Sequence, residues 1–153
     1  MLKPVQKTKA GKAAGTFAIV ASRYNARYVD GMLNAAVREL KRTGARVQVV
    51  RVPGAYEIPV VAAKLSALNQ PPAAIICLGV ILRGETTHAQ HIGEAVSQAL
   101  MQIQIQHGVP VIHEVLLLEN KQQAEARCLD PKHNRGVEAA QTALEMARVL
   151  AQI

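Results

Sequence analysis

Short apolar runs alternate with longer amphipathic segments along this chain, and this alternation limits the folds open to it. The apolar runs predict four strands, at residues 17–21, 47–52, 73–82 and 109–118. The segments between and after them repeat apolar residues at helical spacing, which predicts helices at residues 26–43, 58–68, 89–106, 120–128 and 134–153. Strands that alternate with helices form parallel sheets covered on both sides. The sequence therefore predicts an α/β three-layer sandwich whose strands are buried on both faces.

Glycine and proline mark the ends of these elements. Gly44 follows the first predicted helix and Gly108 the third, positions typical of helix C-caps. Pro59 falls in the first turn of the second helix, where a missing N–H is tolerated. No repeat or linker divides residues 15–153, so we expect a single domain there. Residues 1–14 carry lysines without any acidic residue and predict a flexible basic arm.

The net charge of +7 suggests an anionic partner, but its distribution narrows the choice. Much of the excess lies in the predicted arm, and the remaining basic residues are spread out rather than clustered. The chain has one Phe, three Tyr and no Trp, too few rings for a stacking reader of single-stranded nucleic acid. A small phosphorylated ligand therefore fits better than a nucleic acid.

The cysteines and the N-terminus indicate a cytoplasmic protein. Cys77 and Cys128 are too few for a disulfide framework, so we expect two free thiols in a reducing compartment. The basic N-terminus lacks the apolar segment of a secretory signal. No uninterrupted apolar run reaches the length of about 18 residues that a membrane span requires.

The histidines do not form a recognisable metal site. His88 and His91 share a helix face, but neither a CxxC nor an HExxH motif accompanies them. We therefore expect no metal, and interpret three histidines as solvated surface residues: His91, His107 and His133.

Polar residues and glycines gather where the predicted strands end. Ligands of parallel sheets bind at the carboxyl ends of the strands. The segments at those ends are residues 22–25, 53–57, 83–88 and 119–120.

The segment after the third strand carries the most distinctive chemistry. Thr87 and Gln90 match a capping box, which predicts a helix start there. Free N–H groups at a helix N-terminus bind anions, and Gly84 lets the backbone approach a ligand closely. His88 would then stand beside a bound phosphate as a proton-transfer group. The alternative is an ordinary capped helix with a surface histidine.

Other candidates each have a plainer interpretation. Glu57 could accept hydrogen bonds from ligand hydroxyls, or be a first-turn glutamate favoured by the helix dipole. Tyr24 and Tyr56 could stack on a planar ring, or be semi-buried packing residues. The basic stretch containing Arg127 and Arg135 could clamp a phosphate, or be a solvated connector.

Taken together, these segments resemble the lumazine synthase family of riboflavin biosynthesis. The resemblance covers nearly the whole chain after the arm. It rests on Ser-Arg-Tyr-Asn at 22–25, Val-Pro-Gly-Ala-Tyr-Glu-Ile-Pro at 52–59, the stretch 78–88 ending in Arg-Gly-Glu-Thr-Thr-His, Gly-Val-Pro-Val at 108–111, and 134–140. It implies a flavodoxin-like four-stranded parallel sheet. It also implies a transferase that condenses 5-amino-6-ribitylamino-pyrimidinedione with 3,4-dihydroxy-2-butanone 4-phosphate to 6,7-dimethyl-8-ribityllumazine, without a cofactor or a metal.

The resemblance also implies a role for each matching position. His88 is the implied proton-transfer residue. The implied phosphate ligands are Glu85, Thr86 and Arg127, with Arg135 as an additional candidate. The residues implied to meet the pyrimidine and the ribityl chain are Tyr24, Asn25, Ala55, Tyr56, Glu57, Val80, Ile81, Leu82 and His113.

The family further implies a homopentamer, or a multiple of pentamers, with sites between subunits. His113, Arg127 and Arg135 would come from the adjacent chain. Helix 89–106 would line the fivefold centre, and the arm would add a strand to a neighbouring sheet. Riboflavin synthase is a candidate associated protein.

The chain departs from the family in several places, among them Ala89-Gln90 after His88, where the family usually has an aromatic and an acidic residue. His113-Glu114 stands where the family commonly has Phe-Gly, Leu117-Leu118 where it has Thr-Thr, and residues 128–133 replace a Gly- and Lys-containing connector. Two alternatives to the enzyme follow: a flavin- or lumazine-binding relative with weak catalysis, and a cage-forming protein.

Overall fold

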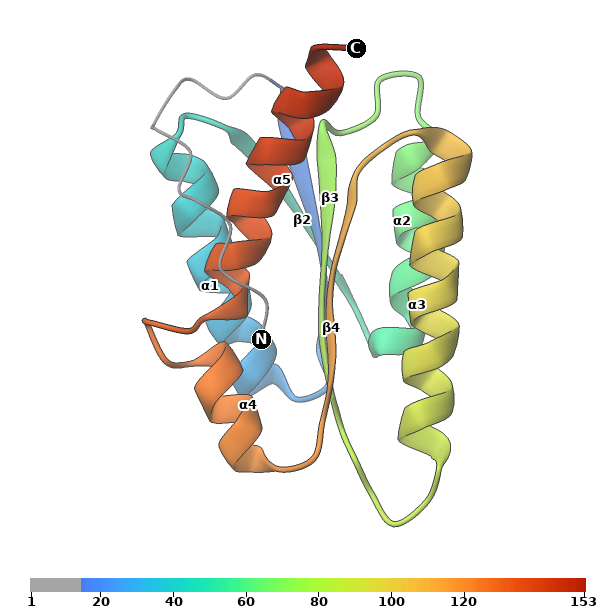
Figure 1. Ribbon diagram of the computed structural model, residues 1–153, viewed down its shortest axis with the longest axis vertical. Helices are drawn as coiled ribbons and strands as arrows, with labels where there is room; N and C mark the ends of the chain where they lie inside the picture. Colours follow the sequence, from blue (N-terminus) through green and yellow to red (C-terminus); the bar gives the residue numbers. More distant parts are fainter. Residues whose placement is uncertain (1–14) are drawn as a thin grey trace.

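A computed structural model describes residues 15–153 as one parallel sheet between two helical layers (Figure 1). Its strands are β1 (Thr16–Ser22), β2 (Arg46–Val52), β3 (Ala74–Leu82) and β4 (Val111–Leu118), in the order β2-β1-β3-β4. Its helices are α1 (Ala26–Arg42), α2 (Ile58–Ser66), α3 (His88–His107), α4 (Lys121–Cys128) and α5 (Arg135–Ala151). The predicted elements and the three-layer architecture are confirmed. A short 3₁₀ helix, η1 (Ala55–Glu57), was not predicted.

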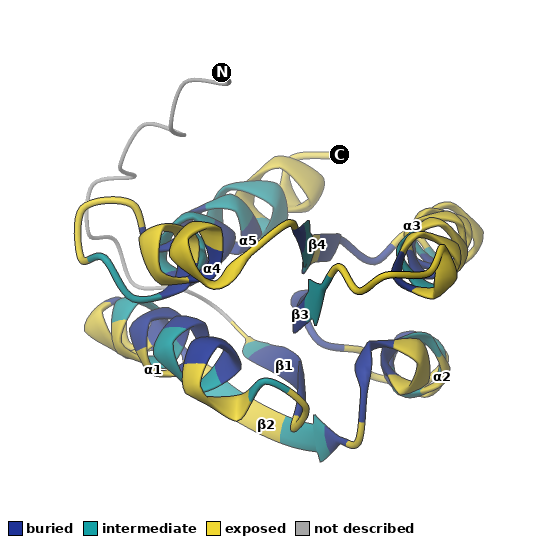
Figure 2. Ribbon diagram, turned by 90° about the horizontal axis from the view of Figure 1, so that it is seen from below, coloured by how far each residue is buried: buried dark blue, intermediate teal, exposed yellow. Residues whose placement is uncertain are grey.

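The helices divide between the two faces of the sheet. Viewed along the strands, α1, α4 and α5 cover one face, and α2 and α3 cover the other (Figure 2). Side chains alternate along each strand, so Ile19 and its register partner Ile76 face the first layer. Val20 and its partner Cys77 face the second. The apolar strands therefore supply two separate cores.

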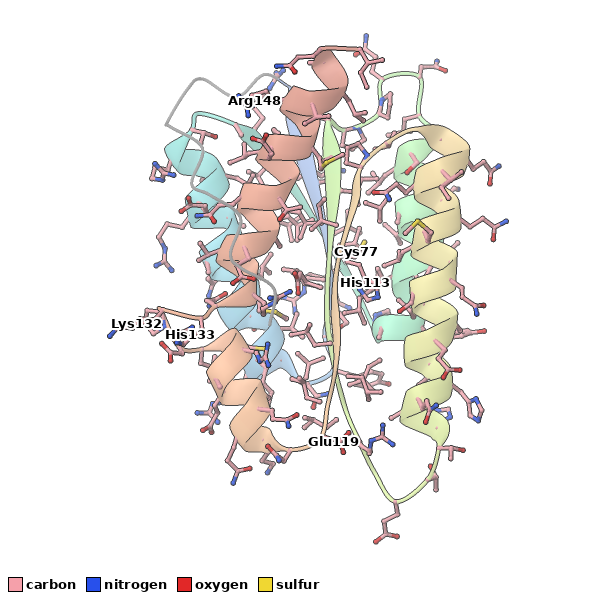
Figure 3. All side chains as sticks on the ribbon, in the orientation of Figure 1. Cys77, His113, Glu119, Lys132, His133 and Arg148 are labelled. Carbon is pink, nitrogen blue, oxygen red and sulfur yellow. The ribbon has the colours of Figure 1, made fainter. Side chains whose placement is uncertain are left out.

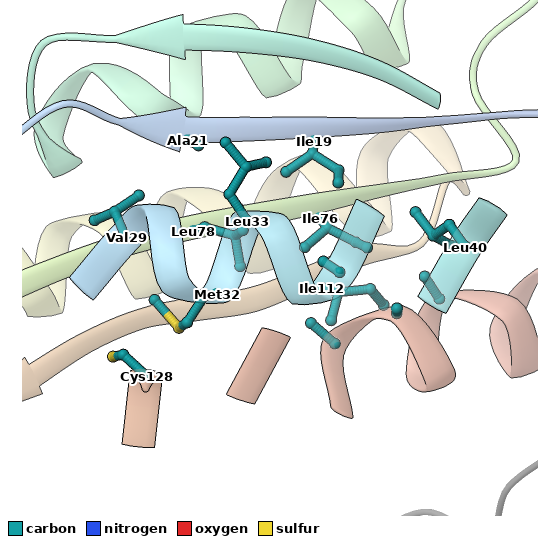
Figure 4. Packing of buried hydrophobic residues seen from close by; sticks show 14 of the residues in the cluster. Ile19, Ala21, Val29, Met32, Leu33, Leu40, Ile76, Leu78, Ile112 and Cys128 are labelled. Atoms are coloured by element: carbon teal, nitrogen blue, oxygen red, sulfur yellow. The ribbon is translucent and has the colours of Figure 1, made fainter. Parts of the chain in front are cut away.

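The first layer is packed unusually closely. An added Cβ on Gly136 of α5 would lie 2.0 Å from the carbonyl oxygen of Met32 on α1. One on Gly31 would lie 2.6 Å from the carbonyl oxygen of Cys128. Asn134 lies in the connector between α4 and α5. Its side-chain amide donates to the carbonyls of Cys128 on α4, at 2.8 Å, and of Gly31 on α1, at 3.2 Å. Glycine is therefore required where α1 meets its neighbours, and the buried cluster there includes Met32 and Cys128 (Figure 4).

β2 departs from the prediction that every strand is buried on both faces. Only Val52 in this strand is fully buried, and Val49 is 42% exposed. β2 lies at the edge of the sheet, where polar residues such as Arg46 and Gln48 interrupt the apolar pattern. The expectation was wrong because an edge strand has a neighbour on one side only.

Three further expectations concern the cysteines, membrane-spanning helices and the N-terminal arm. Cys77 and Cys128 are free, as predicted, and both are buried. Burial raises the pKa of Cys77 to about 12 and that of Cys128 to about 11. None of the helices in residues 15–153 is long and apolar enough to cross a membrane. The predicted arm, residues 1–14, lies outside the described residues.

Candidate active site

The loops at the carboxyl ends of β1, β2 and β3 are fastened to one another. Arg23 N–H donates to Val52 O at 2.8 Å, and Tyr24 N–H donates to Pro53 O at 3.0 Å. Asn25 adopts a left-handed conformation with φ 56°, which suits asparagine better than most residues. Its side-chain amide donates to Val80 O at 2.7 Å. The three strand ends therefore form one rigid platform.

Gly54 brings Tyr24 and Glu57 close together on this platform. An added Cβ there would lie 2.8 Å from Tyr24 Cδ2 and 3.3 Å from Glu57 Oε2. Only glycine leaves room for both groups. Tyr24 is 68% exposed and Tyr56 67% exposed. The interpretation of these two rings as semi-buried packing residues is therefore wrong, and both can meet a ligand.

β3 extends beyond β1 at this end. Its pairing with β1 stops at Leu78, whereas its pairing with β4 continues to Leu82. The last residues of β3 consequently turn backbone groups toward the loop after β1, where Asn25 already binds one of them. Val80 is buried, and Ile81 and Leu82 are half-buried.

The loop between β3 and α3 is exposed from residue 83 to residue 88. α3 begins at His88, but the predicted capping box does not form. Thr87 has φ −78° and ψ 3° rather than the extended backbone of a capping residue, and its hydroxyl contacts His91 Nε2 at 3.3 Å instead. Thr86 Oγ1 accepts from His88 N–H at 3.3 Å. The helix start and its hydroxyl groups thus face solvent beside His88 and Glu85.

Arg135 lies in an ion-pair cluster within the chain. Its Nε and Nη2 donate to both carboxylate oxygens of Glu114, at 3.1 and 3.0 Å, and its Nη1 donates to Glu138 at 2.6 Å. Glu114 is buried, and desolvation raises its pKa against the opposing effect of Arg135. Sequence reasoning noted Glu114 only as a departure from the family. A carboxylate in the middle of an apolar strand could have indicated a buried cation partner.

His113 lies in the body of β4, away from the strand's carboxyl end. It is the register partner of Cys77 on the face toward α3, where Figure 3 labels the two side chains near each other. Its imidazole contacts Ser97 on α3. Sequence reasoning did not single out Ser97, because an isolated serine within a helix gives no signal.

The sheet separates the predicted site residues into two groups. The platform and the His88 loop belong to one end of the sheet, on the side of η1, α2 and α3. Arg127 lies exposed in the last turn of α4, on the helical layer that covers the opposite face (Figure 2). A single chain therefore does not bring Arg127 to the start of α3.

Comparison with known proteins identifies the family of the chain. The family model described as 6,7-dimethyl-8-ribityllumazine synthase matches residues 14–151. The chain is 44% identical over 140 residues to the 6,7-dimethyl-8-ribityllumazine synthase of Stenotrophomonas maltophilia (strain R551-3), covering 90% of each chain. It is 43% identical over 144 residues to that of Xylella fastidiosa (strain 9a5c), covering 92% of this chain and 93% of the relative. The chain belongs to the 6,7-dimethyl-8-ribityllumazine synthase family.

Two further features complete the description of this lumazine synthase family member. Residues 15–153 contain no group of three His, Cys, Asp or Glu side chains placed to hold a metal ion. An open stretch of surface lies on the outer face of α3, away from the strand ends, and Ser97, Met101 and Ile105 are among the residues that line it. Met101 is 54% exposed and Ile105 75% exposed, so this helix leaves apolar side chains uncovered.

Proposed function

We propose that this chain condenses 5-amino-6-ribitylamino-pyrimidinedione with 3,4-dihydroxy-2-butanone 4-phosphate to give 6,7-dimethyl-8-ribityllumazine, phosphate and water. The family match over residues 14–151 carries the proposal. The amine of the pyrimidine forms an imine with the ketone and releases water. Phosphate then leaves, and attack of the ribitylamino nitrogen on the remaining carbonyl closes the ring with loss of a second water to give the lumazine. The chain would act without a cofactor, so most of the acceleration must come from positioning and proton transfer.

The platform at the strand ends is the proposed pyrimidine and ribityl site. Tyr24 would stack on the heterocycle, and Glu57 would accept hydrogen bonds from ribityl hydroxyls. Backbone groups of residues 80–82, beyond the end of β1, would bind the ring edge. Asn25 holds the loop to Val80 O, while Ala55 and Tyr56 line the side formed by η1. The closeness of Tyr24 and Glu57 across Gly54 supports this assignment.

The start of α3 is the proposed phosphate site. Glu85 and Thr86 would hold the phosphate at the helix start through backbone N–H groups and the Thr86 hydroxyl. His88, on the first turn, would transfer the protons that imine formation and phosphate loss require. Arg127 would close on the phosphate with its bidentate guanidinium. Arg135 stays an additional candidate only, because Glu114 and Glu138 already bind its guanidinium and a phosphate would have to compete with both carboxylates.

Since Arg127 and the His88 loop lie on different layers, we propose that each site forms between two copies of the chain. Arg127 and His113 would come from the neighbour in a cytoplasmic homopentamer or a multiple of pentamers. The uncovered Met101 and Ile105 support a subunit contact along α3. The open edge of β2 would receive the neighbour's N-terminal arm as an added strand. Riboflavin synthase remains a candidate associated protein.

The direct test is formation of the lumazine product. Purified protein with both substrates should raise the product's absorbance faster than the uncatalysed mixture. Replacing the ketone substrate with its dephosphorylated analogue should abolish the excess rate, because phosphate is the leaving group. A rate equal to background, with the pyrimidine still bound, would overturn the proposal in favour of a binding relative with weak catalysis.

A further inference from the structure

The imidazole of His113 is hydrogen-bonded on both nitrogens, and the donors fix its proton. Within residues 15–153, β4 is the edge strand opposite β2, so alternate N–H groups on its outer side have no strand partner there. One of these, Val115 N–H, donates to His113 Nδ1 at 3.1 Å. A backbone N–H can only donate, so Nδ1 carries a lone pair.

The proton of the neutral ring must therefore lie on Nε2. His113 Nε2 is 2.8 Å from Ser97 Oγ, and Ser97 Oγ donates to the Gly93 carbonyl at 2.8 Å. Ser97 has committed its own hydrogen to Gly93, so it accepts from Nε2–H. The hydrogen bonds therefore run from His113 Nε2–H to Ser97 Oγ and from Ser97 Oγ–H to the Gly93 carbonyl. Only the neutral Nε2–H tautomer of His113 allows both.

The surroundings also disfavour a charged ring. Ser97 faces the imidazole from α3 and Cys77 from β3; the serine is uncharged, and burial keeps the Cys77 thiol protonated at neutral pH. Partial burial lowers the pKa of His113. Protonation would also place a second hydrogen on Nδ1 against Val115 N–H.

The ring is nevertheless accessible at the edge of the molecule. His113 is exposed, and Ser97 lies on the open outer face of α3 with the uncovered Met101 and Ile105. A neighbouring copy that covers His113 and this face of α3 would contact a flat, uncharged ring with a fixed orientation.

We propose that Ser97 is a positioning residue of the substrate site, because it holds His113 as a neutral Nε2–H imidazole that serves as the flat ring toward the pyrimidinedione. This inference rests on the proposed function, since His113 reaches the pyrimidine only in the assembled enzyme. Ser97 touches no substrate and acts through His113.

The tautomer is tested first, independently of activity. Solid-state ¹⁵N NMR of the full assembly with labelled histidine should show one imidazole in the Nε2–H form at about pH 8 that keeps this form to lower pH than an unperturbed imidazole. His113→Phe should remove that signal and so identify it. Ser97→Ala should give a tautomer mixture that protonates at higher pH, whereas Ser97→Thr should keep the single form. A wild-type His113 that is charged near neutrality, or protonated on Nδ1, would overturn the proposal.

Kinetics then test the link to the substrate. Ser97→Ala should raise the KM for the pyrimidine about fivefold, the effect of one lost hydrogen bond, and more at about pH 6 than at about pH 8. Ser66→Ala is the matched control, since Ser66 Oγ makes the same bond to a carbonyl four residues earlier but lies on α2. In a His113→Phe background, Ser97→Ala should have no effect on the KM.

The outcomes separate the two proposals. An equal KM change in both backgrounds would refute the positioning role even if the enzyme is active. A fixed tautomer in a protein that makes no lumazine would refute the proposed function and, with it, the substrate part of this inference.

Discussion

The two helical layers of this chain differ in how far contacts within a single copy cover their side chains. The layer of α1, α4 and α5 is closed by glycine contacts, the Asn134 bridges and the Glu114–Arg135 ion pair. The layer of α2 and α3 carries the exposed His88 loop and leaves Met101 and Ile105 uncovered. One face of the sheet is therefore a scaffold closed within the chain, while the other leaves a surface that a second copy would complete in the proposed assembly.

The largest effect should come from breaking the closed layer at its tightest contact. Gly136→Ala places a Cβ against the Met32 carbonyl, which cannot move without shifting α1. We expect a loss of at least about 3 kcal/mol in the free energy of unfolding, or failure to fold. Urea denaturation followed by circular dichroism measures it.

Gly93→Ala on α3 is the matched control in the other layer. The nearest atoms to a Cβ there are 3.8 and 3.9 Å away, on Leu117. Because alanine favours helix over glycine, this variant should be more stable by about 0.5–1 kcal/mol. Equal destabilisation by both substitutions would contradict the contrast between the layers.

The next largest effect should follow from leaving Glu114 unpaired. Arg135→Met removes the guanidinium that binds both carboxylate oxygens of Glu114. This variant should have a free energy of unfolding lower by about 3–5 kcal/mol. Glu114→Leu combined with Arg135→Met should recover most of this loss. Full persistence of the loss in the double variant would show that the charge pairing is not the cause.

The same variant has a defined pH dependence. Burial raises the pKa of Glu114 in the folded protein, and loss of Arg135 removes a group that opposes this rise. A carboxyl whose folded pKa exceeds its unfolded value destabilises the fold as pH rises above the unfolded value of about 4.3. The penalty of Arg135→Met should therefore be smaller at about pH 5 than at about pH 8. A larger penalty at the lower pH would contradict this origin.

The sequence predicted the elements well because each carries its own local pattern. The apolar run of β3 and the glycines after α1 and α3 required no long-range information. The exposure of β2 could not be predicted, since edge position depends on strand order. The Glu114–Arg135 pair and the Ser97–His113 contact join residues 21 and 16 positions apart, and no local pattern reports such contacts.

The residue roles at the site came from the resemblance rather than from local chemistry. Segment 83–88 shows the limit: its capping box was wrong, while its helix start was displaced by one residue only. The Thr87 hydroxyl contacts His91 instead, a position that the two-residue motif does not include.

A smaller effect is expected from Arg127, which lies on the closed layer but faces outward. Arg127→Ala should raise the KM for the phosphate substrate about tenfold to a hundredfold, the value of a charge-assisted hydrogen bond. The KM for the pyrimidine and the free energy of unfolding should barely change, because the side chain is exposed. Equal changes in both KM values would refute a phosphate role.

The most direct test of a site shared between copies is complementation. One variant carries Tyr24→Ala and His88→Ala, and the other carries His113→Ala and Arg127→Ala; neither alone should turn over appreciably. When an equimolar mixture is unfolded and reassembled, sites between unlike copies should restore about one quarter of the wild-type rate. A mixture no more active than the mean of its two parents would show that each site lies within a single chain.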